Sequence, residues 1–341
     1  ENLANKENYL IKFDKINFNY SKNLNKNETL QDFSDFFKID GDNLVLKENK
    51  VIIDKNIQIP KGFLVVIKSG QQIILKNNAF IFSNSPWSAI ANENKIIISG
   101  EESNFGGGIF IDTKNKKSIF KNVFFSNLNG PDDQINKELI LYGTLNFHES
   151  NVELANIEFK NINSEDVVNI FRSDFNIRNL KFYNAVSDGI DFDFSFGSAE
   201  NLYFENIGGD ALDFSGSDVT INILNSKFVA DKIVSAGEMS SIEVSNVKST
   251  DSYSGIVSKD GSNVKITNID LKRVQFPFAA YLKKPEYEKP SFIKVYSKHL
   301  IKNKSNFLVD RTSEILINDK RVGIYNKNVI NLLNKINLQN E

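Results

Sequence analysis

The sequence predicts an all-β chain that winds into a parallel β-helix, a solenoid with coils of about 22 residues. Two observations support this prediction. A repeat of roughly 22 residues runs from about residue 140, and apolar and polar residues alternate with period two inside each copy. This alternation is typical of strands. A fixed period of this length with no helical stretch inside the unit is typical of a solenoid built from short strands.

The repeat is clearest in two consecutive copies, Ser150–Asn161 and Ser173–Asn184, and later copies stay in phase with them. We place Asn122 and Phe125 in an earlier coil, ahead of a loop near 129–138. One Asn recurs at Asn156, Asn179, Asn201, Asn225, Asn246 and Asn268. Three places later the series reads Phe159, Phe182, Phe204, Phe228, Ser249 and Leu271.

The asparagine series has a structural explanation in this fold. Equivalent positions in successive coils lie about 4.8 Å apart, the spacing of neighbouring strands. Side-chain amides stacked at that spacing can form hydrogen bonds along the column, as Asn ladders do in cross-β structures. We therefore expect these asparagines to support the solenoid.

The two ends of the chain differ from the repeat. Residues 1–50 are polar and mixed, with a short helix or edge segment at FSDFFKI, and we interpret them as an N-terminal cap or flanking segment. Residues 51–300 form the predicted β-helix, whose first coils are less regular. Residues 301–341 are the predicted C-terminal cap, because Val329, Ile330, Leu332, Leu333 and Ile336 have helical spacing there. Solenoids need such caps at both ends.

The composition excludes several classes of function. The 341 residues have a formal net charge of -2 and no cysteine, so the chain has no overall basic field for nucleic acid and no thiolate chemistry. The longest apolar runs are too short for a transmembrane helix.

Aspartates also recur with the period of the repeat. The first column holds Asp166, Asp188, Asp210 and Asp231. The second column holds Asn169, Asp191, Asp213, Ser235 and Ser258. The third column holds His148, Phe171, Asp193, Ser215, Gly237 and Asp260, and Arg172, Lys232, Glu238 and Lys259 lie close to it in the sequence. If the repeat stacks as predicted, six carboxylates from adjacent coils share a small area.

Such a grouping needs compensation. Two carboxylates about 5 Å apart repel by ~3 kcal/mol at an effective dielectric constant near 20. They respond by raising one pKa, by binding a cation such as Ca²⁺, or by pairing with Lys and Arg. Carboxyl groups of unequal pKa are the groups that acid–base chemistry on sugars uses. The alternative is that these aspartates cap the tight turns between strands.

Four segments then show a resemblance to a known family. Ser187–Asp191, Gly209–Asp213, Asp231–Ser235 and Gly255–Lys259 resemble, in order and spacing, the motifs Asn-Thr-Asp-Gly, Gly-Asp-Asp, Gly-His-Gly and Arg-Ile-Lys of the polygalacturonase family. That family of glycoside hydrolases belongs to the pectin-lyase-like superfamily of right-handed parallel β-helices. The resemblance implies a right-handed solenoid and activity on a polysaccharide.

The resemblance can be carried over residue by residue. Asp188, Asp210 and Lys259 match the family's first Asp, the first Asp of its pair and its final Lys. Ala211 stands at the second Asp of the pair, Lys232 at the His and Val257 at the Arg, so the match is more specific for the fold than for hydrolysis.

Lyases and C5-epimerases of this fold need a base, an acid and a group that neutralises a uronate carboxylate. The predicted catalytic residues are Asp188, Asp191, Asp193, Asp210, Asp213, Lys232, Lys259 and Asp260. The predicted substrate-binding residues are His148, Arg172, Glu238, Tyr281, Lys283 and Lys284. His148 is also a candidate base, two coils from Asp193. The segment 281–290 is either part of a groove for an anionic sugar or an ordinary loop.

These inferences give a carbohydrate-active β-helix that acts on an acidic polysaccharide by lyase, epimerase or hydrolase chemistry. The alternative is a non-catalytic β-helix for glycan binding, the cell envelope or assembly. No cofactor is required, with Ca²⁺ left open, and no nucleic acid or transmembrane segment is expected. The expected location is outside the cell or at the cell envelope, and oligomer formation stays open.

Overall fold

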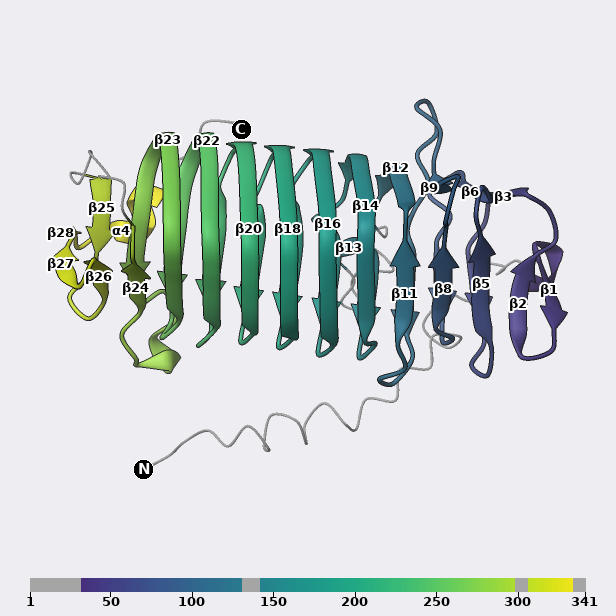
Figure 1. Cartoon of the computed structure of the whole chain (residues 1–341), viewed down its shortest axis with the longest axis horizontal. Helices are drawn as coiled ribbons and strands as arrows, with labels where there is room; N and C mark the ends of the chain where they lie inside the picture. Colours follow the sequence, from purple (N-terminus) through teal and green to yellow (C-terminus); the bar gives the residue numbers. More distant parts are fainter. Residues whose placement is uncertain (1–31, 131–141, 298–305, 334–341) are drawn as a thin grey trace.

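The chain forms a right-handed parallel β-solenoid in the computed structural model, which describes residues 32–130, 142–297 and 306–333 (Figure 1). Strands of neighbouring coils lie side by side along the whole length of the molecule. Asp166 is the register partner of Asp188, so one coil spans 22 residues at this point. The predicted fold class and coil length are therefore confirmed.

Each full coil contributes to three sheets. The first sheet stacks β4 (Ile57–Ile59), β7 (Ile81–Ser83), β10 (Ile109–Asp112), β13 (Gly143–His148), β15 (Asp166–Phe171), β17 (Asp188–Asp193), β19 (Leu212–Ser215) and β21 (Lys232–Gly237). It continues through the last parts of β22 (Ser241–Lys259) and β23 (Asn263–Tyr281) to β25 (Phe307–Val309) and β28 (Ile324–Tyr325).

The second and third sheets are joined by long bent strands. The second sheet stacks β2 (Asn43–Leu46), β5 (Leu64–Lys68), β8 (Trp87–Ile90) and β11 (Ser118–Lys121), and then the first parts of β14, β16, β18, β20, β22 and β23. It ends with β24 (Phe292–Val295) and β26 (Glu314–Ile317). The bent strands that continue into the third sheet are β14 (Val152–Asn163), β16 (Asp174–Ala185), β18 (Phe196–Ile207) and β20 (Asp218–Val229), with β22 and β23. The earlier strands of the third sheet are β3 (Lys50–Ile53), β6 (Gln72–Leu75), β9 (Ile96–Ser99) and β12 (Val123–Asn129).

Antiparallel hairpins close both ends of the solenoid. At the N-terminal end, a single 3₁₀ turn η1 (Phe33–Asp35) leads into β1 (Phe37–Asp40), which pairs with β2. Parallel pairing begins at β2, so the solenoid starts within the predicted 1–50 segment. At the other end, β27 (Lys320–Val322) pairs with β26, and the helix α4 (Val329–Leu333) follows. The predicted C-terminal helix is thus confirmed, while Ile336 and most of the predicted 129–138 loop lie outside the described residues.

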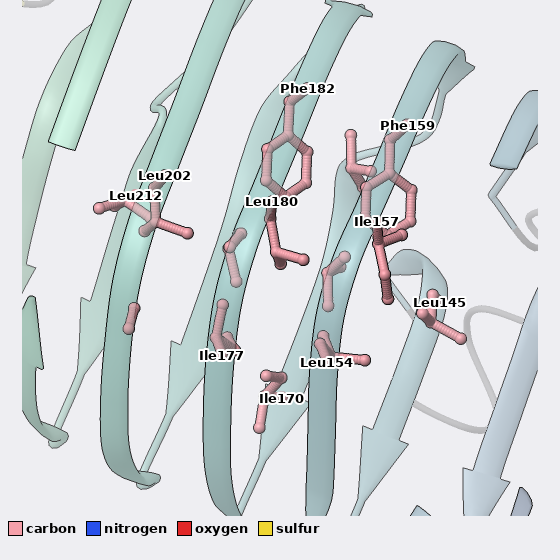
Figure 2. Packing of buried hydrophobic residues seen from close by; sticks show 14 of the residues in the cluster. Leu145, Leu154, Ile157, Phe159, Ile170, Ile177, Leu180, Phe182, Leu202 and Leu212 are labelled. Atoms are coloured by element: carbon pink, nitrogen blue, oxygen red, sulfur yellow. The ribbon is translucent and has the colours of Figure 1, made fainter. Parts of the chain in front are cut away.

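The core is built from stacks of equivalent apolar side chains. Phe125, Phe159, Phe182 and Phe204 stack with ring centroids 4.6–4.9 Å apart and nearly parallel planes. Figure 2 shows Phe159 and Phe182 at matching positions, with aliphatic side chains of the same coils packed beside them. The stack confirms that Asn122 and Phe125 belong to an earlier coil. Because each coil repeats the previous one at strand spacing, aromatic rings reach stacking distance without any further adjustment.

Two ladders of asparagine side chains follow two corners of the solenoid. In the predicted ladder, Asn179 donates to Asn156 at 2.9 Å and Asn201 donates to Asn179 at 3.2 Å. A second ladder, which the sequence analysis did not identify, runs through Asn127, Asn161, Asn184 and Asn206. All four residues of the second ladder have positive φ, as do Asn156 and Asn179. Asn suits these turns because it tolerates the left-handed conformation better than other residues with a Cβ.

A buried serine ladder follows the corner between the first and second sheets. The backbone N–H of each serine donates to the hydroxyl of the serine one coil later, at 2.8–3.2 Å. Its members in this stretch are Ser150, Ser173, Ser195, Ser217, Ser240 and Ser262, all 3% exposed or less. A buried N–H without an acceptor is costly. The ladder therefore explains why Ser recurs where each coil turns from the first sheet into the second.

The register corrects five predicted series. Asn201 pairs with Ile223 and Phe204 with Ser226, so Asn225 and Phe228 do not continue their series, and Phe228 is exposed. In the acidic columns, Lys232 rather than Asp231 follows Asp210, because Asp213 pairs with Ser235. Val257, not Ser258, is the partner of Ser235, and Lys259, not Asp260, takes the place after Gly237. The coils at these positions have 22 or 23 residues, and the errors arose because a like residue one or two places away was matched instead of the true partner.

Candidate functional site

The outer surface of the first sheet collects most of the predicted site residues, in rows that run along the solenoid axis. In β17, Ile190 and Phe192 point into the core, while Asp188, Asp191 and Asp193 lie between them at partly exposed positions. The first row is Asp166, Asp188, Asp210 and Lys232; the second is Asn169, Asp191, Asp213 and Ser235; the third is His148, Phe171, Asp193, Ser215, Gly237, Lys259 and Tyr281. We call this surface the acidic face. Strand alternation places Asp191 and Asp193 on the side opposite Ile190 and Phe192, whereas Asp188 lies at the start of the strand, where the chain leaves the turn.

Two of the carboxylates act as turn caps. Asp188 accepts the backbone N–H of Asp210 at 2.7 Å, and Asp210 accepts the backbone N–H of Lys232 at 2.8 Å. The Lys232 ammonium lies 3.1 Å from Asp210 and 2.5 Å from Asp231. Asp188 and Asp210 thus have part of the structural role that was the alternative interpretation of the columns.

The second and third rows carry a carboxyl cluster in which Asp191 and Asp193 share a side-chain amide, while Asp213 accepts the backbone N–H of Phe214 at 2.9 Å. The Asn169 amide donates to Asp166 at 3.2 Å, to Asp191 at 3.3 Å and to Asp193 at 3.5 Å. One amide group cannot satisfy three ionised carboxylates at once, because it offers only two hydrogens. The arrangement therefore favours retention of protons on some of these carboxyl groups.

Burial and mutual repulsion raise the pKa values of the cluster. Burial raises the pKa of Asp193 to about 6, and the charges of Asp213 and Glu238 add to this effect. Burial likewise raises the pKa of Asp188 to about 6. The pKa of Asp191 is raised well above its ordinary value by burial and by Asp193, Asp166 and Asp213. Carboxyl groups that retain protons near neutral pH can serve as general acids.

The buried pair of Asp210 and Lys232 has a different balance. Burial raises the pKa of Asp210 to about 8, although the Lys232 ammonium opposes the shift. The carboxylates of Asp210 and Asp231 in turn raise the pKa of Lys232 despite its burial. The ammonium is therefore charged over the whole neutral range, and it limits the repulsion within the first row.

Lysines gather at the C-terminal end of the acidic face. The Lys259 ammonium lies 3.8 Å from Asp213, whose side chain is 29% exposed. The pKa of Lys259 is raised by Asp213 and Tyr281 against the effect of its burial. Lys283 is exposed, yet burial of part of its side chain and the charges of Lys259, Lys232 and Lys284 lower its pKa. Mutual repulsion among lysines of this kind favours binding of an anion.

The loop after β23 is held against this end by two acidic residues. Asp260 is 1% exposed and accepts the backbone N–H groups of Lys283 and Lys284 at 2.6 and 2.7 Å. Glu238 pairs with the Lys284 ammonium. Asp260 was predicted to be catalytic, and the structure places its carboxylate on the loop backbone instead. Tyr281, predicted to bind substrate, is 3% exposed and packs near α4 with Val257 and Leu308.

His148 and Arg172 belong to a second polar group at the N-terminal end of the acidic face. His148 lies two coils from Asp193, as predicted, and stacks on Phe171 with ring centroids 4.9 Å apart. Its Nδ1 lies 3.7 Å from Asp112. Arg172 lies 3.8 Å from Glu149 and over the Phe171 ring. These contacts make His148 part of an aromatic and ionic group separate from the carboxyl cluster.

Two groups of described residues place ligand atoms within 4.8 Å of one another. They are Asp112 with His148 and Glu149, and Asp188 with Asp210 and Asp213. Calcium binds through six to eight oxygen ligands. In the second group, the Lys232 ammonium already provides positive charge at Asp210, and backbone N–H groups occupy one oxygen each of Asp188 and Asp210. One oxygen of each of these two carboxylates is therefore already engaged.

Sequence analysis missed three residues of this surface. Tyr142 lies close to the cluster, since burial and the charges of Glu165, Asp193 and Asp166 raise its pKa. Asn169 was placed in a column but was not recognised as the bridge between carboxyl groups. Phe194 follows Asp193 and is exposed. The register could have identified Tyr142, because its neighbour Gly143 pairs with Asp166.

Comparison of the chain with protein-family models, with curated proteins and with solved structures finds no match. Among the described residues, no helix is long and apolar enough to cross a membrane. The structure thus establishes a parallel β-solenoid with a clustered acidic face.

Proposed function

We propose that the acidic face is the active site of an enzyme that acts on an acidic polysaccharide. The proposal rests on one observation: a carboxyl group of raised pKa, a second carboxyl group 3.8 Å from an ammonium group, and a lysine whose pKa is lowered by neighbouring lysines belong to the acidic face and the loop beside it. Asp193, Asp213 with Lys259, and Lys283 are these groups. Acid, base and anion-binding groups in one place are the requirements of chemistry at a uronate.

The roles follow from the environments. Asp193, with a pKa of about 6, supplies the proton to the leaving oxygen. Asp213 is the base, because its side chain is 29% exposed and the Lys259 ammonium lies only 3.8 Å from its carboxyl group. Lys259 and Lys283 neutralise the substrate carboxylate. A long face with rows along the solenoid axis suits an extended polymer rather than a small molecule.

The same groups support two reactions. In elimination, Asp213 removes the proton α to the uronate carboxylate, the C4–O bond breaks as the C4–C5 double bond forms, and Asp193 protonates the departing oxygen. In hydrolysis, Asp213 removes a proton from water while water attacks the anomeric carbon, and Asp193 protonates the glycosidic oxygen. The first reaction yields an unsaturated end, whereas the second yields only a new reducing end.

The test is incubation with a panel of uronate polymers, for example polygalacturonate, alginate and hyaluronan, with dextran as the neutral control. Absorbance at about 230–240 nm, reducing ends and exchange of the C5 proton separate lyase, hydrolase and epimerase chemistry. We expect turnover of at least one anionic polymer and a 10²–10⁴-fold lower rate for Asp213→Asn, since this is the usual contribution of a general base. Lys259→Met removes one of the ammonium groups that are proposed to neutralise the substrate carboxylate. Lys265→Met, which removes an exposed lysine of the second sheet, is its matched control. Absence of turnover on every polymer would refute the proposal.

A non-catalytic glycan-binding module is the second candidate, and one observation favours it. Asp188, Asp210 and Asp260 accept backbone N–H groups and thereby stabilise turns. If this is the role of the whole cluster, a polymer binds without being altered, and Asp213→Asn binds it as tightly as the wild-type protein. The same panel, read by affinity electrophoresis, decides between the two functions.

A further inference from the structure

An exposed aromatic ring lies beside the acidic face at an unusual backbone position. Phe194 is 44% exposed and has a φ of 49°, a left-handed conformation that bulky residues rarely adopt. The next coil has Gly216 near this ring, and a Cβ there would lie 2.6 Å from the ring atom Cδ1. The ring therefore lies close over the Gly216 backbone. The positive φ of Phe194 and the glycine at position 216 each cost stability. Because the Phe194 ring lies outside the core, core packing does not offset this cost.

Phe194 ends a line of aromatic rings that leads to the carboxyl cluster. Its ring contacts that of Phe171 edge to face, with centroids 6.2 Å apart, and Phe171 stacks on His148. Phe171 is the register partner of Asp193, whose carboxyl group is the proposed acid. Aromatic rings, carboxyl groups and lysines thus follow one another along the solenoid axis, one coil after another at about 4.8 Å.

We propose that Phe194 forms the floor of a sugar-binding subsite next to the reacting unit, where one pyranose ring of the polysaccharide stacks on the exposed phenyl face. This inference rests on the proposed function and deepens it, because it sets the polymer along the solenoid axis. The anionic groups of the polymer lie toward Lys259 and Lys283, and the sugar that follows the stacked unit lies toward Phe171. A sugar ring has one face of C–H groups and a polar rim, so it matches a flat apolar ring set beside carboxyl groups.

The chain contains a matched control for this proposal. Phe228 is 47% exposed and has a φ of 55°, so it shares the residue type, the exposure and the backbone conformation of Phe194. It lies near the end of β20, in the third sheet rather than the first. Replacing either ring by Ala removes the same exposed area at the same backbone geometry.

The experiment measures KM and Kd for the anionic polymer that the panel selects, with dextran as the neutral control. Phe194→Ala is expected to raise both constants about five- to tenfold with kcat nearly unchanged, the effect of losing one aromatic contact. Phe194→Tyr restores them, Phe194→Leu does not because its side chain is not flat, and Phe228→Ala leaves them at the wild-type values.

Fluorescence gives a readout that needs no turnover. Trp87 is the only tryptophan and is fully buried in the core, so Phe194→Trp adds a single exposed reporter. We expect the emission of this tryptophan to shift to shorter wavelength as the polymer binds. Turnover with wild-type KM and Kd in Phe194→Ala would overturn the subsite while leaving the enzyme proposal intact. Binding that Phe194→Ala weakens, without turnover, would support the subsite and overturn catalysis. No binding of any polymer would overturn both.

Discussion

Replacing Asp193 by Asn is expected to stabilise the protein above pH 7 and to lower its rate on the polymer by 10²–10⁴-fold. Asn keeps the shape of the side chain and can still accept from Asn169, but it cannot transfer a proton. The loss of rate corresponds to removal of a general acid. Gain of stability together with loss of activity is the expected signature of a residue kept for function.

The direction of the stability change follows from the raised pKa. The folded protein holds the Asp193 proton up to about pH 6, whereas the unfolded chain releases it near 3.8. The contribution of this group to stability is therefore complete below pH 4 and is lost as the pH rises through 6. Asn does not titrate, so the Asp193→Asn variant has no such loss. Its free energy of unfolding is therefore expected to equal that of the wild-type protein at pH 4 and to exceed it by about 1–3 kcal/mol at pH 8.

Urea unfolding of both proteins at pH 4 and pH 8 measures this gain. Asp174→Asn is the control, because Asp174 is an exposed carboxylate at the start of β16 in the second sheet. It is expected to change stability by less than about 0.5 kcal/mol at either pH. If Asp193→Asn is less stable than the wild-type protein at pH 8, the carboxyl group is ionised and well paired in the native state, contrary to our account.

Lys232→Met is expected to destabilise the protein by about 3–5 kcal/mol at pH 9, the usual cost of removing one partner of a buried ion pair. Met keeps most of the side-chain volume but leaves Asp210 and Asp231 without the ammonium between them. We expect this substitution to change stability more than Asp193→Asn does.

The effect is expected to grow with pH. Lys232 lowers the pKa of Asp210, so its removal raises that pKa above its present value of about 8. A raised pKa in the folded state gives stability that is lost as pH rises, and the difference from wild type is therefore larger at pH 9 than at pH 5, by up to about 1.4 kcal/mol. Thermal unfolding across this range measures it. Adding Asp210→Asn to Lys232→Met is expected to remove most of the pH dependence, and an unchanged dependence would show that Asp210 is not the group concerned.

The sequence was sufficient to predict the solenoid because its repeat is carried by residues that every coil needs. Asn156 and Asn179 are repeated where the backbone turns with positive φ, and Phe159 and Phe182 where the core must be filled. Such positions accept few residue types, so the same residue recurs from one repeat to the next and makes the period visible in the sequence. The serine ladder escaped notice because Ser is common in loops, and its buried role depends on which N–H lies one coil away.

The acidic face could be predicted only in part, since its rows do not keep one residue type. Lys232 follows Asp210, and Lys259 follows Gly237, so charge changes sign or disappears within a row. Matching Asp to Asp therefore displaced Asp231 and Asp260 by one residue. The sequence also does not distinguish structural aspartates from chemically active ones. In the structure, Asp210 accepts a backbone N–H, whereas Asp193 faces an amide and another carboxyl group.

The coil register buries a set of carboxyl groups together and thereby raises their pKa values well above that of a free aspartate. These raised pKa values are tested most directly by titration of the aspartate side-chain carbons by NMR in protein labelled with ¹³C-aspartate. We predict that Asp188 and Asp193 titrate near pH 6 and Asp210 near pH 8, each signal being lost in the matching Asn variant. A protein whose aspartates all titrate below pH 5 would contradict the account.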